Sequence, residues 1–329
     1  MTLAATIAGA YPKIGDLPEE QKLRKAFHDF DKGIVSDEEL EQIMSEVTEV
    51  AIREQIEAGM DVVTDGLIRW EDALTYQARK ISGFKIGGLT RFFDTNTFYR
   101  QPIVESRLEA SKPMTIADYQ FAAGKTEKPV RMVLTGPYTI AKLSKNEFYR
   151  EFKQMVFDLA YIIHAEIKAL EEAGCKFIQI DEPAILSNKE DLALFLKAWE
   201  IVTAGLTQAE KTLFLNFGNI GAVYPKILNV AVERIGFELT PGHPNWEVIK
   251  EKPVKDKKLM AGLVDARNTK MESETNLAEA VRELETQVGG DNLWISTSHS
   301  LEFLPRTCAK NKMYLIANVV KQLKGASVS

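Results

Sequence analysis

Short apolar segments bounded by turn residues recur along the chain and predict eight β-strands. Stretches with apolar residues at helical spacing separate most of these segments and predict helices. The clearest helix begins at Ser36, where Glu39 completes a capping box, and it stops before Gly59. A second long helix runs from about residue 147 to residue 173. The strand segments lie near residues 3–9, 60–65, 130–135, 176–181, 212–217, 234–239, 258–264 and 292–297.

This alternation of strands and helices predicts an α/β fold, a single (β/α)8 TIM barrel, because no Gly/Ser-rich linker divides residues 1–329 into domains. The pattern breaks once, over residues 66–129, which form a long excursion after the second strand. Loops of this length usually serve function, and the aromatic residues near positions 92–100 argue against disorder. We expect the excursion to form part of the wall of a site, with Asp94 and Arg100 on it.

Two similar helix–strand motifs in the chain point to one functional edge. In each, a helix ends at glycine, Gly59 or Gly174, and a short apolar strand then runs into an acid, Asp65 or Asp181. The carboxyl ends of parallel strands meet at one face of a barrel, which is the usual place for function. The second of these motifs ends in two adjacent carboxylates, Asp181 and Glu182, before a proline.

Composition narrows the class of ligand. The chain has 41 basic and 47 acidic residues, a net charge of -6, which disfavours a nucleic-acid surface and favours a small-molecule substrate. Its two cysteines, Cys175 and Cys308, are not in a Cys-x-x-Cys spacing, so we expect a reducing, cytoplasmic location without a disulfide framework or thiolate metal cluster. No basic start precedes a long apolar run, and no segment is long and apolar enough to span a membrane.

Polar side chains gather at the predicted strand ends. A carboxylate such as Asp181 can there bind an ammonium group or act as a base, although it could equally cap a helix or pair with an arginine. Glu238 and His299 are candidate metal ligands, but a catalytic zinc ion wants three protein ligands and Asn216 is a poor third. The full set is Asp65, Thr135, Asp181, Glu182, Asn216, Glu238, Asp265, Arg267 and His299.

Two further segments suggest ligand contacts. The turn at residues 135–137, Thr-Gly-Pro, lets the backbone approach a ligand closely, although it could be a simple turn. Near the amino terminus, Lys22, Arg24 and Lys25 form a basic cluster on a predicted helix that could grip an acidic ligand tail.

Several motifs together resemble the cobalamin-independent methionine synthases, which consist of two similar (β/α)8 barrels. The segments that carry this resemblance over nearly the whole chain are residues 9–15, 134–137, 179–184 and 262–268. Short stretches at residues 93–96, 143–145, 216–218, 264–268 and 298–301 are more similar to the family's N-terminal barrel than to its zinc-bearing catalytic barrel. Residues 64–66 and 132–137 are instead similar to the second barrel or to its stand-alone archaeal relatives.

The resemblance implies transfer of a methyl group from methyltetrahydrofolate, or from a corrinoid donor, to homocysteine or a related thiol. In the family, zinc holds the thiol as a thiolate. Here the zinc positions carry Asn216, Gly218, Glu238 and His299, so that only the glutamate is matched and the zinc site is degenerate. The serine after the first strand and the folate-stacking tryptophan are likewise replaced, by Ala10 and Leu143.

The residues expected to act follow from this resemblance. Asp181, Glu182 and His299 are the expected catalytic residues, the two carboxylates contacting the ammonium group of the amino acid, and Glu238 and His299 are the expected metal ligands. The basic helix is suited to a folate polyglutamate tail. The expected substrate-binding residues are Thr135, Asp65, Asn216, Arg267, Asp94, Arg100, Lys22, Arg24 and Lys25.

Three functions remain open at this point. The chain is a methyltransferase of the methionine synthase type, or a non-catalytic folate-binding barrel that needs a zinc-bearing partner barrel, or an enzyme of altered chemistry in the same site. The binding subunit explains each lost zinc ligand, whereas the methyltransferase needs another means of activating the thiol.

Overall fold

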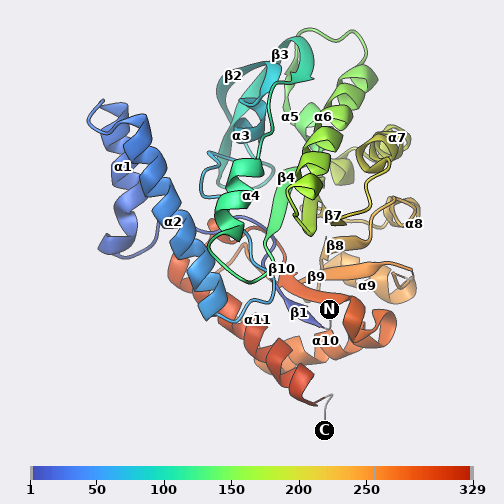
Figure 1. The fold of residues 1–329 in the computed structure, drawn as a ribbon. Coiled ribbons are helices and arrows are strands. Elements are labelled where there is room, and N and C mark those ends of the chain that lie inside the picture. Colours follow the sequence, from blue (N-terminus) through green and yellow to red (C-terminus); the bar gives the residue numbers. More distant parts are fainter. Residues whose placement is uncertain (1–2, 255, 327–329) are drawn as a thin grey trace. The chain divides into compact units, whose positions relative to one another are not determined.

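The computed structural model, drawn in Figure 1, describes residues 3–254 and 256–326. These residues divide into two compact units. The first unit comprises the chain up to Arg69, Phe121–Val130, and the chain from Ala261 onward. The second unit comprises Trp70–Gln120 and Arg131–Met260. Each unit is therefore assembled from segments that are far apart in the sequence.

The first unit contains both ends of the described chain. Its strand β1 pairs in parallel with β10, with Ala4 opposite Trp294, and helix α1 packs against α2 (Figure 1). Its elements are β1 (Ala4–Ala5), η1 (Pro18–Gln21), α1 (Lys22–Asp31), α2 (Asp37–Glu57), α10 (Glu274–Val288), η4 (Gly290–Asn292), β10 (Leu293–Thr297), η5 (Leu301–Phe303) and α11 (Arg306–Ala326).

Helix α2 confirms the predicted start and stop signals. The Ser36 backbone N–H donates to Glu39 at 2.8 Å, and the Glu39 N–H donates to the Ser36 hydroxyl at 3.2 Å. This reciprocal pair satisfies two N–H groups that a helix start leaves without partners. After the helix, Gly59 has a φ of +94°, a left-handed conformation that glycine adopts without steric cost.

The second unit is built on parallel strands with helices between them. Strand β6 pairs in parallel with β4 on one side and with β7 on the other, and β7 pairs in parallel with β8. Its strands here are β4 (Arg131–Thr135), β6 (Phe177–Asp181), β7 (Glu210–Leu215) and β8 (Arg234–Glu238), and its helices are α5 (Pro137–Leu143), α6 (Phe152–Glu172), η2 (Pro183–Ser187), η3 (Lys189–Asp191), α7 (Leu192–Thr203), α8 (Tyr224–Ile227) and α9 (Pro244–Glu251).

Strand β9 (Lys258–Val264) begins in the second unit and ends in the first. The strand order is β1-β10-β9 in the first unit and β9-β8-β7-β6-β4 in the second. The fold class is thus α/β with a mostly parallel arrangement of seven strands, as the alternating pattern predicts.

The predicted long excursion contains a β-hairpin that the sequence pattern did not reveal. Strands β2 (Ile81–Arg91) and β3 (Phe98–Ala110) pair antiparallel, and the short β5 (Lys145–Asn146) pairs in parallel with β3. Helix α3 (Thr75–Ala78) precedes the hairpin, and α4 (Ile116–Ala123) follows it. The hairpin is therefore an ordered structure rather than an irregular loop.

The prediction of a regular second strand at residues 60–65 is wrong. This segment forms an isolated parallel bridge between Val63 and Val130, and the N–H groups of Asp61 and Val62 donate hydrogen bonds to the Ala5 carbonyl. The side chain of Gln55 explains the difference, because its amide donates to the Thr64 carbonyl at 3.0 Å and accepts from the Thr64 N–H at 2.9 Å. A side-chain amide here takes the bonds that a neighbouring strand would make.

Helix α6 confirms the second predicted long helix, although it begins at Phe152 rather than near residue 147. Met155, Val156, Leu159 and Ile163 are fully buried. Residues at this spacing lie on one face of a helix, so these side chains form the contact of α6 with its surroundings.

Among the described residues, no helix has the length and apolar character to cross a membrane.

Candidate functional site

The carboxyl ends of four neighbouring strands in the second unit carry predicted site residues. Thr135 ends β4 and lies opposite Asp181, which ends β6. Asn216 follows β7 directly, and Glu238 ends β8, whose Phe237 lies opposite Leu215. The structure therefore brings these four polar residues to one edge of the unit, as the sequence predicts.

Asp181 lies in surroundings that favour its neutral form. It is half-buried, and Gln179, on the same face of β6, donates to its Oδ1 at 2.7 Å. Burial raises the pKa of Asp181 to about 7, although the Gln179 hydrogen bond and the positive charge of Arg131 oppose this rise. At neutral pH its carboxyl group is thus poised to change charge when a cation arrives.

Arg131 supplies a buried positive charge beneath this edge. It begins β4, is fully buried, and one of its guanidinium nitrogens contacts the Met260 sulfur at 3.3 Å. Burial lowers the pKa of Arg131 to about 9, while Asp181 acts in the opposite direction, so the guanidinium stays charged at neutral pH. Sequence reasoning missed this residue, although an arginine within an apolar strand segment was a visible signal.

Glu182 has a different environment from Asp181. It is fully buried, and its carboxylate accepts hydrogen bonds from the N–H of Tyr138 at 3.0 Å and from the N–H and hydroxyl of Thr139 at 2.7 and 2.6 Å. The carboxylate therefore stabilises the start of α5, where a helix favours negative charge. The predicted contact between Glu182 and an ammonium group stays a prediction. The Glu182 carboxylate already accepts three hydrogen bonds within the protein.

Gly136 makes this capping possible. A Cβ atom at this position would lie 2.3 Å from the Glu182 carboxyl carbon, closer than any real contact. Burial raises the pKa of Glu182, and the Thr139 and Tyr138 donors oppose that rise. The predicted Thr-Gly-Pro turn thus serves a structural purpose that involves the neighbouring acid.

Thr135 is also held by its surroundings. Its hydroxyl donates to the Ala73 carbonyl, and its backbone N–H donates to the Gln77 side-chain oxygen at 2.8 Å. The Gln77 amide nitrogen in turn donates to the Thr135 carbonyl at 3.3 Å. Gln77 therefore fixes the end of β4 in the same way that Gln55 fixes Thr64, and the pattern of the sequence did not point to either glutamine.

Glu238 lies beside His243, which is not among the predicted site residues. The Glu238 Oε2 is 3.7 Å from His243 Nε2, and His243 Nδ1 accepts the N–H of Asn245 at 3.3 Å. This bond places the proton of a neutral His243 on Nε2, toward the carboxylate. Burial lowers the pKa of His243, so that the neutral ring is favoured at neutral pH.

The residues at the family's zinc positions do not fit a zinc centre. Asn216 and Gly218 offer no thiolate or imidazole, and within the described part of the chain no group of three or more His, Cys, Asp or Glu side chains could hold a metal ion. Glu238 and His299 as metal ligands stay a prediction, but Asn216 and Gly218 add no donor that is typical of zinc.

The predicted site residues on the hairpin are both exposed. Asp94 lies at its tip, and Arg100 lies on β3, where its backbone N–H donates to Asp72 at 3.1 Å. The tip also contacts the segment after β7, because the Phe93 ring stacks on Phe217 with centroids 5.0 Å apart. The excursion therefore reaches the end of a strand, as a site wall should.

The first unit holds the remaining predicted residues. Asp65 is buried and accepts the Leu67 N–H at 3.1 Å, and His299 is fully buried with its Nδ1 2.9 Å from the Ser298 hydroxyl. Asp265 accepts the backbone N–H of Arg267 at 2.7 Å, which orders the loop after β9. Asp265 and His299 come after β9 and β10, whereas Asp65 ends the irregular segment at residues 60–65. The roles of all three toward a substrate stay predictions.

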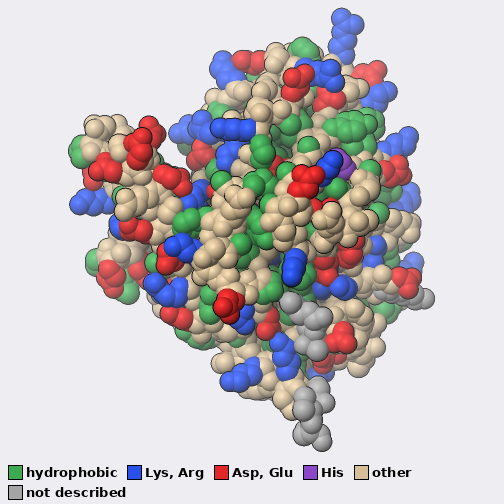
Figure 2. All heavy atoms as spheres, viewed as in Figure 1, with side chains coloured by type: hydrophobic (Ala, Val, Ile, Leu, Met, Phe, Trp, Pro, Cys, Tyr) green, Lys and Arg blue, Asp and Glu red, His purple; other side chains and the backbone are tan. Residues whose placement is uncertain are grey.

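The basic cluster lies on α1. All three side chains are exposed, and Lys22 forms an ion pair with Glu46 of α2. Exposed cations can attract an acidic ligand tail, which keeps this prediction open. Figure 2 shows basic and acidic side chains intermixed over the visible face, as expected for a chain of net charge -6.

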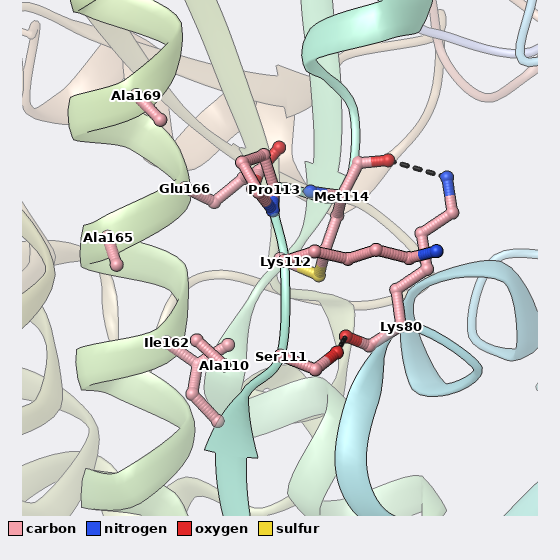
Figure 3. A pocket seen from close by; sticks show the side chains of 10 residues that line it. All are labelled: Lys80, Ala110, Ser111, Lys112, Pro113, Met114, Ile162, Ala165, Glu166 and Ala169. Atoms are coloured by element: carbon pink, nitrogen blue, oxygen red, sulfur yellow. Dashed lines mark hydrogen bonds between the residues drawn. The ribbon is translucent and has the colours of Figure 1, made fainter.

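A separate cavity of about 190 Å³ lies between α6 and the segment that follows β3 (Figure 3). Lys80 donates to the Met114 carbonyl at 2.6 Å, and its ammonium lies 3.6 Å from the centroid of the Tyr76 ring. The buried Glu166 accepts the N–H of Met114 at 2.7 Å. None of the predicted site residues lines this cavity, so it is distinct from the polar strand ends.

Comparison with known proteins identifies the family. The family model described as "Cobalamin-independent synthase, Catalytic domain" matches residues 10–322. A methionine synthase of Saccharolobus solfataricus is 34% identical over 324 residues, which cover 98% of this chain and 95% of that protein. A methionine synthase of Sulfurisphaera tokodaii is 32% identical over 323 residues, covering 98% and 92%.

Solved structures show the same fold. A B12-independent methionine synthase from Shewanella sp. W3-18-1, in complex with selenomethionine, has a TM-score of 0.86 at 20% identity and covers 100% of this chain and 99% of that one. A putative vitamin-B12 independent methionine synthase from Listeria monocytogenes has a TM-score of 0.79 at 14% identity, covering 98% and 99%. The motif-based resemblance is confirmed at the level of the family, although the matching model is that of the catalytic domain and not of the N-terminal barrel. The chain belongs to the cobalamin-independent synthase family, matching the model of its catalytic domain.

Proposed function

We propose that this chain is a methyltransferase of the methionine synthase type, which transfers a methyl group to homocysteine or a related thiol. The observation that carries the proposal is the 34% identity, over 98% of the chain, to a relative named methionine synthase. The family description as cobalamin-independent favours methyltetrahydrofolate over a corrinoid as the methyl donor.

The polar strand ends of the second unit suit an amino-acid substrate. The ionised Asp181 would bind the ammonium group, and the ammonium would in turn favour the charged carboxylate. Asn216 would contribute an amide beside it, while Glu182, through α5, would keep the turn that precedes Tyr138 in place. The thiol sulfur would lose its proton and attack the methyl carbon, and the donor nitrogen would take up a proton as it leaves.

We assign no step to zinc in this mechanism. In the family, zinc would supply a thiolate near neutral pH, but the donors at Asn216 and Gly218 do not fit that ion. A free thiol is only a few per cent ionised at neutral pH, so the reaction is expected to speed up as pH rises toward the thiol pKa of about 8.5.

The finer architecture also belongs to this proposal. Residues 60–65 contact the Ala5 carbonyl of β1 on one side and form a bridge to Val130, just before β4, on the other. This segment thus has the neighbours of an eighth strand, which supports closure of the strands into a single (β/α)8 barrel. The free state of Cys175 and Cys308 supports a cytoplasmic location.

The replaced zinc ligands favour a second candidate, a folate-binding barrel that works with a zinc-bearing partner barrel. In that case the exposed Arg24 and Lys25 would hold the acidic folate tail, and the partner would activate the thiol. The third reading, altered chemistry in the same site, has no specific observation in its favour.

One assay separates these candidates. Purified protein is incubated with homocysteine and methyltetrahydrofolate, or with methylcobalamin, and methionine is measured with and without a zinc-bearing catalytic barrel of the family. Methionine formation by the protein alone, lost in Asp181→Asn and retained in the exposed-site control Asp256→Asn, supports the methyltransferase. Formation only with the partner supports the binding subunit. No product in any mixture would reject both.

A further inference from the structure

Two phenylalanines in the second unit have a backbone conformation that bulky residues rarely adopt. Phe93 has a φ of +46° and Phe217 a φ of +62°. A left-handed conformation is disfavoured for residues with a large side chain and persists only where the surroundings enforce it. Such residues cluster at functional sites, so their occurrence as neighbours in space calls for an explanation.

The two residues are in direct contact although they are far apart in the sequence. Their rings are stacked at a centroid distance of 5.0 Å with an interplanar angle of 7°. Phe92 meets both rings edge-on, at 4.8 Å from Phe93 and 5.7 Å from Phe217. The three rings join the tip of the β2–β3 hairpin to the chain immediately after β7.

Hydrogen bonds hold each side of this contact. On the hairpin side, the Phe92 N–H donates to the Thr97 carbonyl at 3.0 Å, and the buried Thr95 hydroxyl donates to the Phe92 carbonyl at 2.6 Å. On the β7 side, the fully buried Asn245 amide donates to the Gly218 carbonyl at 3.1 Å and to the Glu238 carbonyl at 3.0 Å. The surroundings therefore fix both strained residues.

Ordinary core packing does not account for this arrangement. Phe214 and Phe237, which lie in adjacent strands, are fully buried, whereas Phe93 and Phe217 are each half-buried. A half-buried ring gains less from burial than a core ring and would not by itself repay a strained backbone. The contact is better explained by what it places nearby.

The neighbours of the two rings are candidate substrate residues. Asp94 follows Phe93 at the hairpin tip, and Asn216 precedes Phe217 at the end of β7. We propose that Phe93 and Phe217 are positioning residues, whose stacked rings hold the hairpin tip against the end of β7 so that Asp94 and Asn216 act on the same substrate. This inference rests on the proposed methyl transfer. It adds a role for the hairpin in substrate binding, which does not involve the expected zinc positions.

The test compares Phe93→Leu, Phe217→Leu and the double variant with Phe98→Leu, the same change at an exposed phenylalanine of the hairpin. We expect KM for the thiol to rise about tenfold in each single variant with kcat nearly unchanged, because a loosened wall weakens substrate binding. The double variant should be no worse than the more impaired single variant, since the two rings form one contact. Phe217→Tyr, which keeps the ring, should restore KM.

Hydrogen exchange of residues 92–99 gives a second readout that needs no activity. Exchange should accelerate at the hairpin tip in Phe217→Leu, a change outside the hairpin, and stay unchanged in Phe98→Leu. An unchanged KM, or a fall in kcat alone with loss of folded protein, would overturn the positioning role. If the unmodified protein makes no methionine, the proposed function fails, and unchanged exchange in Phe217→Leu would then reject the contact between hairpin and strand as well.

Discussion

The charge of Asp181 makes the stability of the protein depend on pH in a defined direction. Burial raises the pKa of this carboxyl from 3.8 to about 7 in the folded state. The folded state thus binds the Asp181 proton more tightly than the unfolded state does. The bound proton therefore stabilises the folded state at low pH, and this stabilisation is lost as pH rises from about 4 to about 7. A difference of about three pH units corresponds to about 4 kcal/mol.

Replacement of Asp181 by asparagine removes this dependence because the amide does not titrate. We compare the free energy of unfolding of Asp181→Asn with that of the unmodified protein at each pH. The value for the variant minus the value for the unmodified protein should increase by up to about 4 kcal/mol between pH 4 and pH 8. Urea unfolding followed by tryptophan fluorescence at several pH values measures this difference. A constant difference across that range would refute the assignment of the raised pKa to Asp181.

The same carboxyl should control ligand binding in the opposite direction. An ammonium group pairs only with the ionised form, so affinity for methionine should be about tenfold lower at pH 6 than at pH 8. Titration calorimetry of the unmodified protein should show this fall, and Asp181→Asn should bind weakly at both pH values. Equal affinity at pH 6 and pH 8 would mean that Asp181 does not hold the ammonium group.

Two substitutions and a metal analysis provide further tests. Gly136→Ala should lower the free energy of unfolding by about 1–3 kcal/mol, measured by urea unfolding, because the new Cβ would lie 2.3 Å from the Glu182 carboxyl carbon. Glu166→Ala should cost about 3 kcal/mol in the same measurement, since it leaves buried backbone donors without an acceptor, whereas the exposed Glu172→Ala should cost less than about 0.5 kcal/mol. Metal analysis should find well below one zinc ion per purified chain, and one zinc per chain would contradict the donor argument.

The regular elements could be predicted because local chemistry specifies them. The capping box at Ser36 and the left-handed glycines Gly59 and Gly174 bound two long helices, and each feature acts within a few residues. The strand that ends at Asp181 could be placed for the same reason, since a continuous apolar segment ends there in acids. Local signals of this kind do not depend on the rest of the fold.

The features that the sequence did not reveal involve partners that are distant in the sequence. The sequence did not show that the carboxylate of Glu182 accepts hydrogen bonds from the start of α5, more than 40 residues earlier, at Tyr138 and Thr139, although its expected catalytic role stays a prediction. The β2–β3 hairpin was hidden by its exposed and irregular pattern, with bulges between Ser82 and Phe84 and between Ile86 and Leu89. A prediction from periodicity detects neither long-range hydrogen bonds nor interrupted alternation.

Buried side chains that substitute for backbone partners explain how the strand ends are held. Gln55 bonds both backbone groups of Thr64, Gln77 bonds both backbone groups of Thr135, and Asn245 bonds the carbonyls of Gly218 and Glu238. Each amide both donates and accepts, so it can replace a neighbouring strand at a point where the chain must leave the sheet. Such fixation does not depend on the residues that perform chemistry. The loops at the polar edge are therefore held by residues other than Asn216 and Gly218, the residues expected at two of the zinc positions, so the identity of these two side chains does not decide whether the loops keep their positions.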